Sequence, residues 1–219
     1  MFETVKNLIY PLRCPICDRP GCRACLDQLN RLDNRRCPLC GGLNCRCRGA
    51  FCDGYFVPFL YEGELRSSIL RMKYSNRPSY AAGFAALLSE LFAEREHPPF
   101  TRIAHVPFHW TDKLGRDYNA SLLVAKQLAQ RTGIPHGKRV LRKTRRTAKQ
   151  HDLTAAERRN NLSDCFAASN VKGEHILLVD DVLTTGSTVN ECARALKQAG
   201  AASVWSISVA VSYLAKDGK

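Results

Sequence analysis

Strand-like and helix-like hydrophobic patterns alternate along the chain from about residue 50 onward. The run 55–61 is apolar and aromatic, which predicts a strand, and Leu65, Ile69 and Met72 recur at spacings of four and three, which predicts one face of a helix. The same patterns predict helices at 81–92, 122–129 and 187–199 and strands at 103–106, 175–179 and 204–211. Alternation of this kind predicts an α/β fold with a mainly parallel sheet flanked by helices.

Cysteine is concentrated in the part of the chain that precedes these elements. Nine of the 11 cysteines lie between Cys14 and Cys52. We see no signal peptide and no apolar run near the roughly 20 residues of a membrane span, so we expect a cytoplasmic protein. In that reducing compartment, clustered cysteines bind metal more often than they form disulfides. We therefore predict a Cys-rich zinc-binding module at 1–52, followed by an α/β domain at 53–219.

The spacing of the cysteines indicates two structural zinc sites. A two-residue spacer lets both thiolates of a pair face one ion, and zinc prefers four such ligands in a tetrahedron. Paired spacers also fit zinc better than an iron–sulfur cluster. The preferred ligand sets are Cys14, Cys17, Cys22 and Cys25 for one ion, and Cys37, Cys40, Cys45 and Cys47 for the other. The spacer between Cys45 and Cys47 is irregular, so Cys52 remains open as a substitute ligand.

A polar stretch that contains a glycine follows the strand predicted at 175–179. Asp180 and Asp181 come first, and carboxylates at this end of a parallel sheet can accept hydrogen bonds from ribose hydroxyls and hold a divalent cation at one remove. Gly186 lets the backbone approach a phosphate, whose charge is favoured by the N-terminus of the next helix. The candidate loop comprises Asp180, Asp181, Val182, Leu183, Thr184, Thr185, Gly186, Ser187 and Thr188. A glycine with hydroxyls is often only an N-cap, and the preceding acid pair makes this stretch more specific.

The stretch 176–188 resembles the phosphoribosyl pyrophosphate signature of the type I phosphoribosyltransferases. Together with the cysteine pairs and several further motifs in the same order, it makes the whole chain similar to the competence protein ComF family. These motifs are Tyr61-Glu-Gly-Glu-Leu-Arg66, Lys73-Tyr74, Val106-Pro107, Arg116 to Asn119, and 147–161. One departure is Arg116-Asp-Tyr-Asn-Ala120, where the family pattern has Gly and Gln at the second and fifth places.

The resemblance implies a type I phosphoribosyltransferase-like fold behind a zinc-binding module, with phosphoribosyl pyrophosphate and Mg²⁺ as ligands. Asp180 and Asp181 would meet the ribose hydroxyls, and residues 184–188 would hold the 5′-phosphate. The other residues it assigns are Pro107, Phe108 and His109 at the pyrophosphate, with Lys73 and Arg116 as additional phosphate ligands.

A strongly basic segment accounts for more than half of the net charge of +13. Nine Lys or Arg residues against Asp152 and Glu157 fall within 138–159, and by the resemblance this is where the fold carries a lid over the pyrophosphate. The candidate lid or DNA contacts are Lys143, Arg145, Arg146, Lys149 and Arg158. A lid, a track for single-stranded DNA and a solvated charge run all fit this composition. Residues 143–161 contain no Phe, Tyr or Trp, so DNA bases would have to stack elsewhere.

Two functions remain open at this point. The first is a protein that binds phosphoribosyl pyrophosphate with magnesium and acts in DNA uptake and natural transformation, as the family name implies. Its partners would be single-stranded DNA and competence or recombination proteins. The second is an active magnesium-dependent phosphoribosyltransferase on an unidentified base or nucleotide acceptor. No catalytic residue is assigned, because lone histidines such as His105, His109 and His151 are more often structural or exposed.

Overall fold

A computed structural model of the protein describes residues 13–20, 22, 24–33, 36–39, 51–108, 118–144 and 165–213. The strands are β1 (Gly54–Phe56), β2 (Phe59–Leu60), β3 (Arg102–His105), β4 (Leu141–Lys143), β5 (Phe166–Ala168), β6 (His175–Leu183) and β7 (Ser203–Val211). The helices are α2 (Ala24–Asp27), α3 (Gly63–Tyr74), α4 (Tyr80–Ala93), α5 (Ala120–Thr132) and α7 (Ser187–Gln198). In these ranges, no helix combines the length and the apolar character that crossing a membrane requires.

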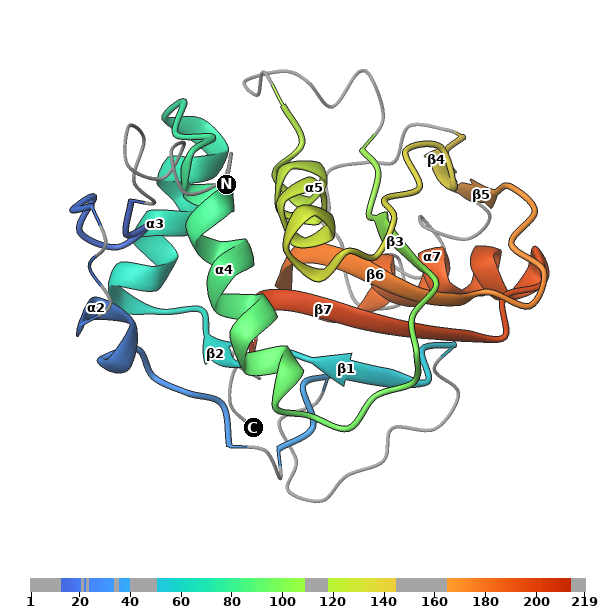
Figure 1. The fold of residues 1–219 in the computed structure, drawn as a ribbon, viewed down its shortest axis with the longest axis horizontal. Coiled ribbons are helices and arrows are strands. Elements are labelled where there is room, and N and C mark those ends of the chain that lie inside the picture. The colour runs from blue at the N-terminus through green and yellow to red at the C-terminus, as the bar shows by residue number, and fades with distance from the viewer. Residues whose placement is uncertain are drawn as a thin grey trace, which may run out of the picture.

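The main sheet has the strand order β1-β7-β6-β3, and β2 also pairs with β7 (Figure 1). Every pairing in this sheet is parallel. The α/β class and the parallel sheet predicted from the hydrophobic pattern are therefore confirmed.

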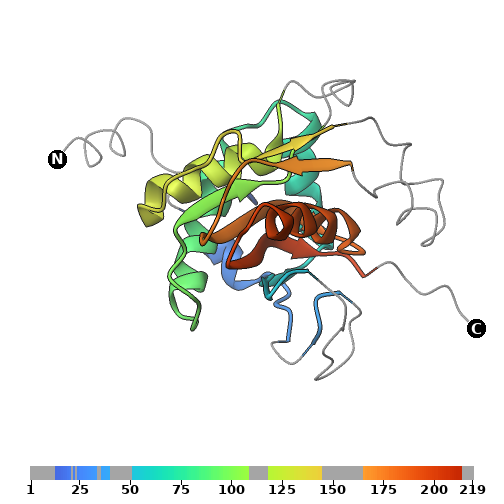
Figure 2. The same cartoon turned by 90° about the vertical axis from the view of Figure 1, so that its right-hand side faces the viewer.

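Helices cover both faces of the sheet, and β6 shows why. Leu177 and Val179 belong to a hydrophobic core that also contains the buried residues of α3, α4 and α5. Their neighbours Ile176 and Leu178 belong to a second core with α7, β4 and β5. Successive side chains of a strand point to opposite faces, so an unbroken apolar strand fills both cores at once. Figure 2 shows this arrangement after a quarter turn.

The helical stripes lie where their spacing placed them. α3 buries Leu65, Ile69 and Met72, the three positions that predicted it. α5 begins after Asn119, whose side chain accepts a hydrogen bond from the Leu122 amide, and ends at Gly133 with a φ of 74°. A left-handed residue at this position is a common helix stop, and glycine adopts it without strain.

Two predicted strands have different bounds. The run 55–61 is split into β1 and β2 at Val57 and Pro58, because proline has no N–H to offer to a ladder. The strand expected at 175–179 extends to Leu183, because β7 continues beside it and Leu183 pairs with Val211.

The antiparallel pair β4–β5 was not predicted. Leu141 pairs with Ala168 and Lys143 with Phe166, and the Thr144 amide donates to the Cys165 carbonyl at 2.7 Å. β4 lies within the basic segment 138–159, and β5 follows that segment. The pair therefore fixes Thr144 and Cys165, the described residues on either side of 145–164.

Candidate functional site

Four cysteines come together near the start of the described chain. The Sγ atoms of Cys14, Cys17, Cys22 and Cys25 all lie within 4.8 Å of one another, and those of Cys22 and Cys25 are 3.7 Å apart. A tetrahedral zinc ion with Zn–S bonds of about 2.3 Å would place its sulfurs about 3.8 Å apart. This set could therefore hold a metal ion such as zinc.

Electrostatics at this cluster also suit a cation. A hydrogen bond from the Arg19 amide lowers the pKa of the Cys17 thiol to about 7. Hydrogen bonding to the Cys17 and Cys22 side chains raises the pKa of Cys25 to about 12. Four thiolates this close repel one another, and a divalent cation bound by all of them would offset the repulsion.

The first cysteine pair is attached to the α/β body. Ser68 Oγ of α3 donates to the Pro15 carbonyl, and Arg71 Nη2 donates to the Ile16 carbonyl at 3.1 Å. Pro15 also packs against Gly83 of α4, where an added Cβ would lie 2.7 Å from the proline Cδ. The cluster is thus held from two helices, while the division into 1–52 and 53–219 remains a prediction.

The second cysteine set is described only in part. Cys40, Cys45 and Cys47 lie outside the described residues. Cys37 and Cys52 are both buried, and burial raises the pKa of Cys52 to about 12. Cys52 belongs to the core that α7 covers. Over the described ranges, the first four cysteines are the one group with metal-ligating geometry, and the second zinc site remains a prediction.

The acid pair lies past the end of a neighbouring strand. The last pairing of β3 with β6 joins His105 to Val179, and the Val106 amide then donates to the Val179 carbonyl at 3.0 Å. Asp180 and Asp181 follow directly, within β6 but beyond the end of β3. The edge of β6 that β3 covers elsewhere is therefore open to other groups here.

Side chains from two helices reach the acid pair. Lys73 Nζ of α3 lies 2.6 Å from Asp181 Oδ1, and both side chains are largely buried, with exposed fractions of 14% and 13%. Ser121 Oγ of α5 donates to Asp180 Oδ1 at 3.0 Å, and the Asp181 amide donates to the same oxygen at 2.9 Å. The structure thus brings Lys73, which only the resemblance had linked to the site, to the acid pair.

Asp180 has an unusual protonation equilibrium. Burial raises its pKa to about 7, the negative charge of Asp181 adds to the rise, and the charge of Lys73 opposes it. A carboxyl with this pKa is only partly ionised at neutral pH. A cation or a set of hydroxyl donors at this point would favour the ionised form.

The loop after β6 turns sharply into α7. Gly186 has a φ of 71° and is the N-cap residue of α7, and its carbonyl accepts from the Asn190 amide at 2.8 Å. Thr185 Oγ1 and Ser187 Oγ lie 2.9 Å apart. The candidate phosphate ligands 184–188 are therefore gathered on one tight turn at a helix N-terminus, where amide groups favour an anion.

The turn after β3 is tied to the neighbouring helices. Asn119 Nδ2 donates to the Val106 carbonyl at 3.0 Å, and the Tyr118 hydroxyl donates to the Met72 carbonyl at the end of α3. Pro107 and Phe108 follow Val106 directly, whereas His109 and Arg116 lie outside the described residues. The start of the candidate pyrophosphate turn thus lies at the same end of the sheet as the acid pair.

Comparison with known proteins gives this geometry a family. Residues 119–219 match the phosphoribosyl transferase domain family. The DNA utilization protein YhgH of Escherichia coli strain K12 is 32% identical over 222 residues, which cover 92% of this chain and 95% of that protein. The protein of the same name from Salmonella typhi is 37% identical over 153 residues, covering 66% of each chain. Competence protein F of Haemophilus influenzae is 35% identical over 102 residues, covering 45% of this chain and 44% of that protein.

The chain belongs to the ComF family. Among solved structures it is similar to a glutamine phosphoribosylpyrophosphate amidotransferase from Bacillus subtilis, with 22% identity and a TM-score of 0.43 over 64% of this chain and 30% of that one.

Two histidines of this ComF-family chain lie at the end of β3. His105 Nδ1 and His136 Nε2 are 3.2 Å apart. Burial lowers the pKa of His105 to about 4 and also lowers that of His136. Both rings are therefore neutral at physiological pH and add no positive charge for a pyrophosphate.

Of the basic lid or DNA candidates in this ComF-family chain, the structure describes Lys143. It ends β4, and the other four lie outside the described residues. Ser121 was not anticipated as part of the site, because a serine in the first turn of a helix carries no distinctive pattern. Tyr61 also belongs near the acid pair, since the charges of Lys73 and Asp181 both affect its pKa, which burial raises.

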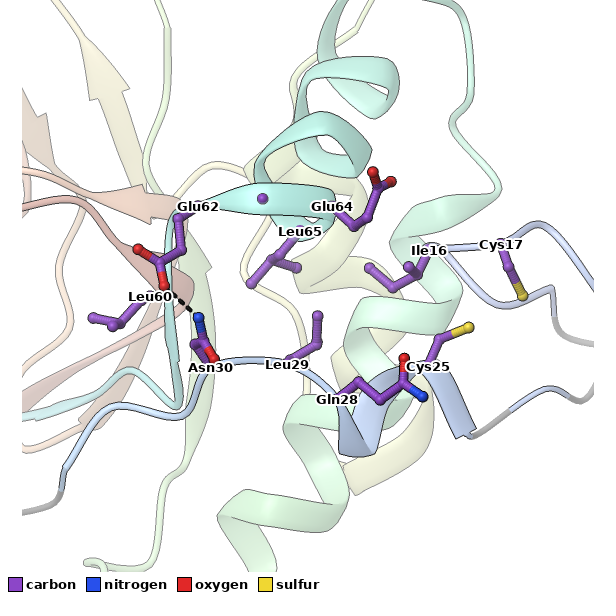
Figure 3. Close-up of a pocket in the computed structure, with 11 residues that line it drawn as sticks. Ile16, Cys17, Cys25, Gln28, Leu29, Asn30, Leu60, Glu62, Glu64 and Leu65 are labelled. Atoms are coloured by element: carbon purple, nitrogen blue, oxygen red, sulfur yellow. Dashed lines mark hydrogen bonds between the residues drawn. The ribbon is translucent and has the colours of Figure 1, made fainter.

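A cavity of about 830 Å³ separates the first cysteine set from the start of α3 in this ComF-family fold (Figure 3). Cys17 and Cys25 line one side, and Leu60, Glu62 and Glu64 line the other. Asn30 Nδ2 donates to Glu62 Oε1 on the side away from the cysteines (Figure 3). The described phosphate candidates are not among its lining residues, so it is separate from the site around the acid pair.

Proposed function

We propose that this protein binds phosphoribosyl pyrophosphate with magnesium on residues 180–188 and acts in DNA uptake. The acid pair supports this best: Asp180 and Asp181 lie beyond the end of β3, and the tight turn at Gly186 follows them. A ligand needs acceptors for its ribose hydroxyls and donors for its phosphate. This segment offers both within nine residues.

Each part of the ligand has a counterpart. The ribose hydroxyls donate to Asp180 and Asp181, and the 5′-phosphate accepts from amides and hydroxyls of 184–188. The pyrophosphate falls to the turn that begins at Pro107 and Phe108, with His109 and Arg116 beyond the described residues. Lys73 would neutralise part of the negative charge of the pyrophosphate, since the Lys73 ammonium lies at the acid pair, 2.6 Å from Asp181.

The acid pair also suits magnesium. Carboxylate oxygens are ligands that this hard cation prefers, and it usually retains several waters and shares its site with substrate phosphates. Magnesium would supply positive charge to the pyrophosphate. Asp180, whose pKa burial and Asp181 raise to about 7, is a carboxyl whose ionised form such a cation would stabilise.

Titration calorimetry with phosphoribosyl pyrophosphate tests this proposal. With magnesium we expect one ligand per chain at low micromolar affinity, and with a chelator of magnesium we expect affinity to fall by about tenfold or more. Full-length protein without measurable binding in magnesium would overturn the assignment of residues 180–188.

Pyrophosphate release separates a binding module from an enzyme. A protein that uses the ligand only as a signal or structural partner releases no pyrophosphate when free bases, nucleosides or single-stranded DNA are added. Release with any of them would establish the alternative function, a magnesium-dependent phosphoribosyltransferase.

The role in DNA uptake is supported by the relatives' names, DNA utilization protein and competence protein. Lys143 and the basic residues that follow it would contact the DNA backbone. The bases need aromatic side chains, and Tyr74 offers one: it follows Lys73 on α3 and is 54% exposed. Nearby, the Arg66 guanidinium lies over the Tyr61 ring at 5.9 Å, so aromatic and cationic groups adjoin the acid pair.

Replacing Tyr74 by Ala is therefore expected to weaken binding of a single-stranded oligonucleotide by about tenfold, because a stacked base contributes about 1–3 kcal/mol. Fluorescence anisotropy over a range of salt concentrations measures both the loss and the phosphate contacts. Phe51→Ala is the matched control, since Phe51 is also exposed, at 41%, but is tied to Asn190 of α7. Equal losses in the two variants would show that α3 has no special role in DNA binding.

A further inference from the structure

Residues 36–39, which include Cys37 of the second cysteine set, lie against the α/β body. The Tyr213 hydroxyl, just after β7, donates to the Cys37 carbonyl at 3.1 Å. Leu39 and Tyr213 both pack against the core that α7 covers. Residues 36–39 are therefore held at the end of the sheet that carries the candidate phosphate loop.

Leu39 contacts the turn of that loop directly. A Cβ added to Gly186 would lie only 2.3 Å from Leu39 Cδ2 and 3.9 Å from Leu183 Cδ1. The leucine methyl thus occupies the space that any side chain at 186 would need. Two features therefore favour glycine at 186: there is no space for a side chain beside Leu39, and the φ of 71° is one that other residues rarely adopt.

Gly186 is the most permissive point of the loop. Thr185 and Ser187 on either side carry the hydroxyls that lie 2.9 Å apart, so a rotation at 186 would separate them. Leu39 blocks motion of the turn toward the core by filling the space on that side. A binding-competent loop that is populated only part of the time lowers affinity by the populated fraction.

We propose that Leu39 is a positioning residue for the candidate phosphate ligands 184–188. Residues 36–39 would then take part in binding the ribose phosphate without touching it. This inference rests on the proposed function. It gives the cysteine module a role in ligand binding, because the segment between Cys37 and Cys40 supports the turn at Gly186.

The test measures the two halves of the ligand separately on the full-length, metal-loaded protein with magnesium. Leu39→Ala is expected to weaken binding of ribose 5-phosphate by about tenfold and to leave inorganic pyrophosphate binding within about twofold. Leu32→Ala is the matched control, because Leu32 is also partly buried against the same core but hydrogen-bonds to Pro58 beside β2. It should leave both affinities within about twofold. Leu39→Met keeps the side-chain volume and the contact with Gly186, so this variant should bind ribose 5-phosphate with about the wild-type affinity.

Three results would overturn the inference. They are equal effects of Leu39→Ala and Leu32→Ala, equal weakening of both ligands by Leu39→Ala, and loss of bound metal or of the folded state in Leu39→Ala but not in Leu32→Ala. The last would show that Leu39 maintains the module and not the loop. Failure of the wild-type protein to bind either ligand would instead overturn the proposed function, so the two failures are distinguishable.

Discussion

Replacing Asp180 and Asp181 together by Asn is expected to reduce binding of phosphoribosyl pyrophosphate by at least about a hundredfold. Each carboxylate would accept a charge-assisted hydrogen bond from a ribose hydroxyl, worth about 1.5–3 kcal/mol, and an Asn oxygen would accept only a weaker neutral bond. The amides keep the size of the side chains but remove the negative charge of the acid pair. The ammonium of Lys73, 2.6 Å from Asp181, would then lose its carboxylate partner. Calorimetry with magnesium present measures the loss.

Asp53→Asn is the matched control for this double variant. Asp53 is another aspartate paired with a lysine, since its Oδ2 lies 2.8 Å from Lys197 Nζ, but it precedes β1 and is not part of the loop. It should bind the ligand like the wild type. Tight binding by the double variant would show that the acid pair does not hold the ribose.

The Asp180→Asn half of the double variant should not lower stability, and thermal unfolding of the double variant shows whether the unpaired Lys73 ammonium does. The folded-state pKa of Asp180 is raised from 3.8 to about 7, so stability falls as the pH rises from about 4 to about 7, and the cost of ionising the buried carboxyl is fully present above that. An amide avoids that cost and can still accept from Ser121. The melting temperature of Asp180→Asn should therefore equal or exceed that of the wild type at pH 8.

Removing the metal from the cysteine module is expected to lower the melting temperature by about 10 °C or more. A structural zinc contributes on the order of 10 kcal/mol to the folding of a small module, which is comparable to the whole stability of many domains. Ile16, Leu26 and Leu29 of this module pack against the core beneath α3 and α4, so their release would expose apolar surface. Thermal unfolding with and without a strong chelator, alongside metal analysis, measures this effect.

Single substitutions locate the metal. Cys22→Ser should release the ion, whereas Cys192→Ala, which removes a fully buried thiol elsewhere in the chain, should retain it. Metal analysis of the wild type is expected to give two zinc ions per chain. A value of one would mean that the set from Cys37 to Cys47 does not form a site. A melting temperature unchanged by complete metal removal would show that the module folds without it.

Periodicity was sufficient to predict the fold because the sheet is buried on both faces. Runs such as 176–179 are apolar throughout, which is typical of core strands, and the spacing of Leu65, Ile69 and Met72 is that of one helix face. The ends of elements depended on partners. β6 extends past Val179 because β7 continues beside it, and no local pattern reports such a partner. β4 and β5 were missed because three residues are too few to show a period.

The site could be predicted only where its residues are neighbours in the chain. Residues 180–188 form one motif, so their chemistry was visible. Lys73 was linked to the site by resemblance, and its contact with Asp181 depends on how α3 packs. Ser121 and Leu39 reach the site from distant segments, and neither has a sequence signature of its own. Contacts of this kind follow from the tertiary structure alone.

The position of β7 sets an order on folding. β1 and β2 both pair with β7, and β6 separates β7 from β3, so the strand made latest among those described lies inside the sheet. While a ribosome is still translating residues 1–202, the two early strands lack the neighbour that would complete their hydrogen bonds. The pairing of β1 and β2 with β7 cannot form until residues 203–211 have been made, and contacts between such distant segments form slowly. Early docking of Ile16, Leu26 and Leu29 against the core would cover part of this apolar surface before β7 is made.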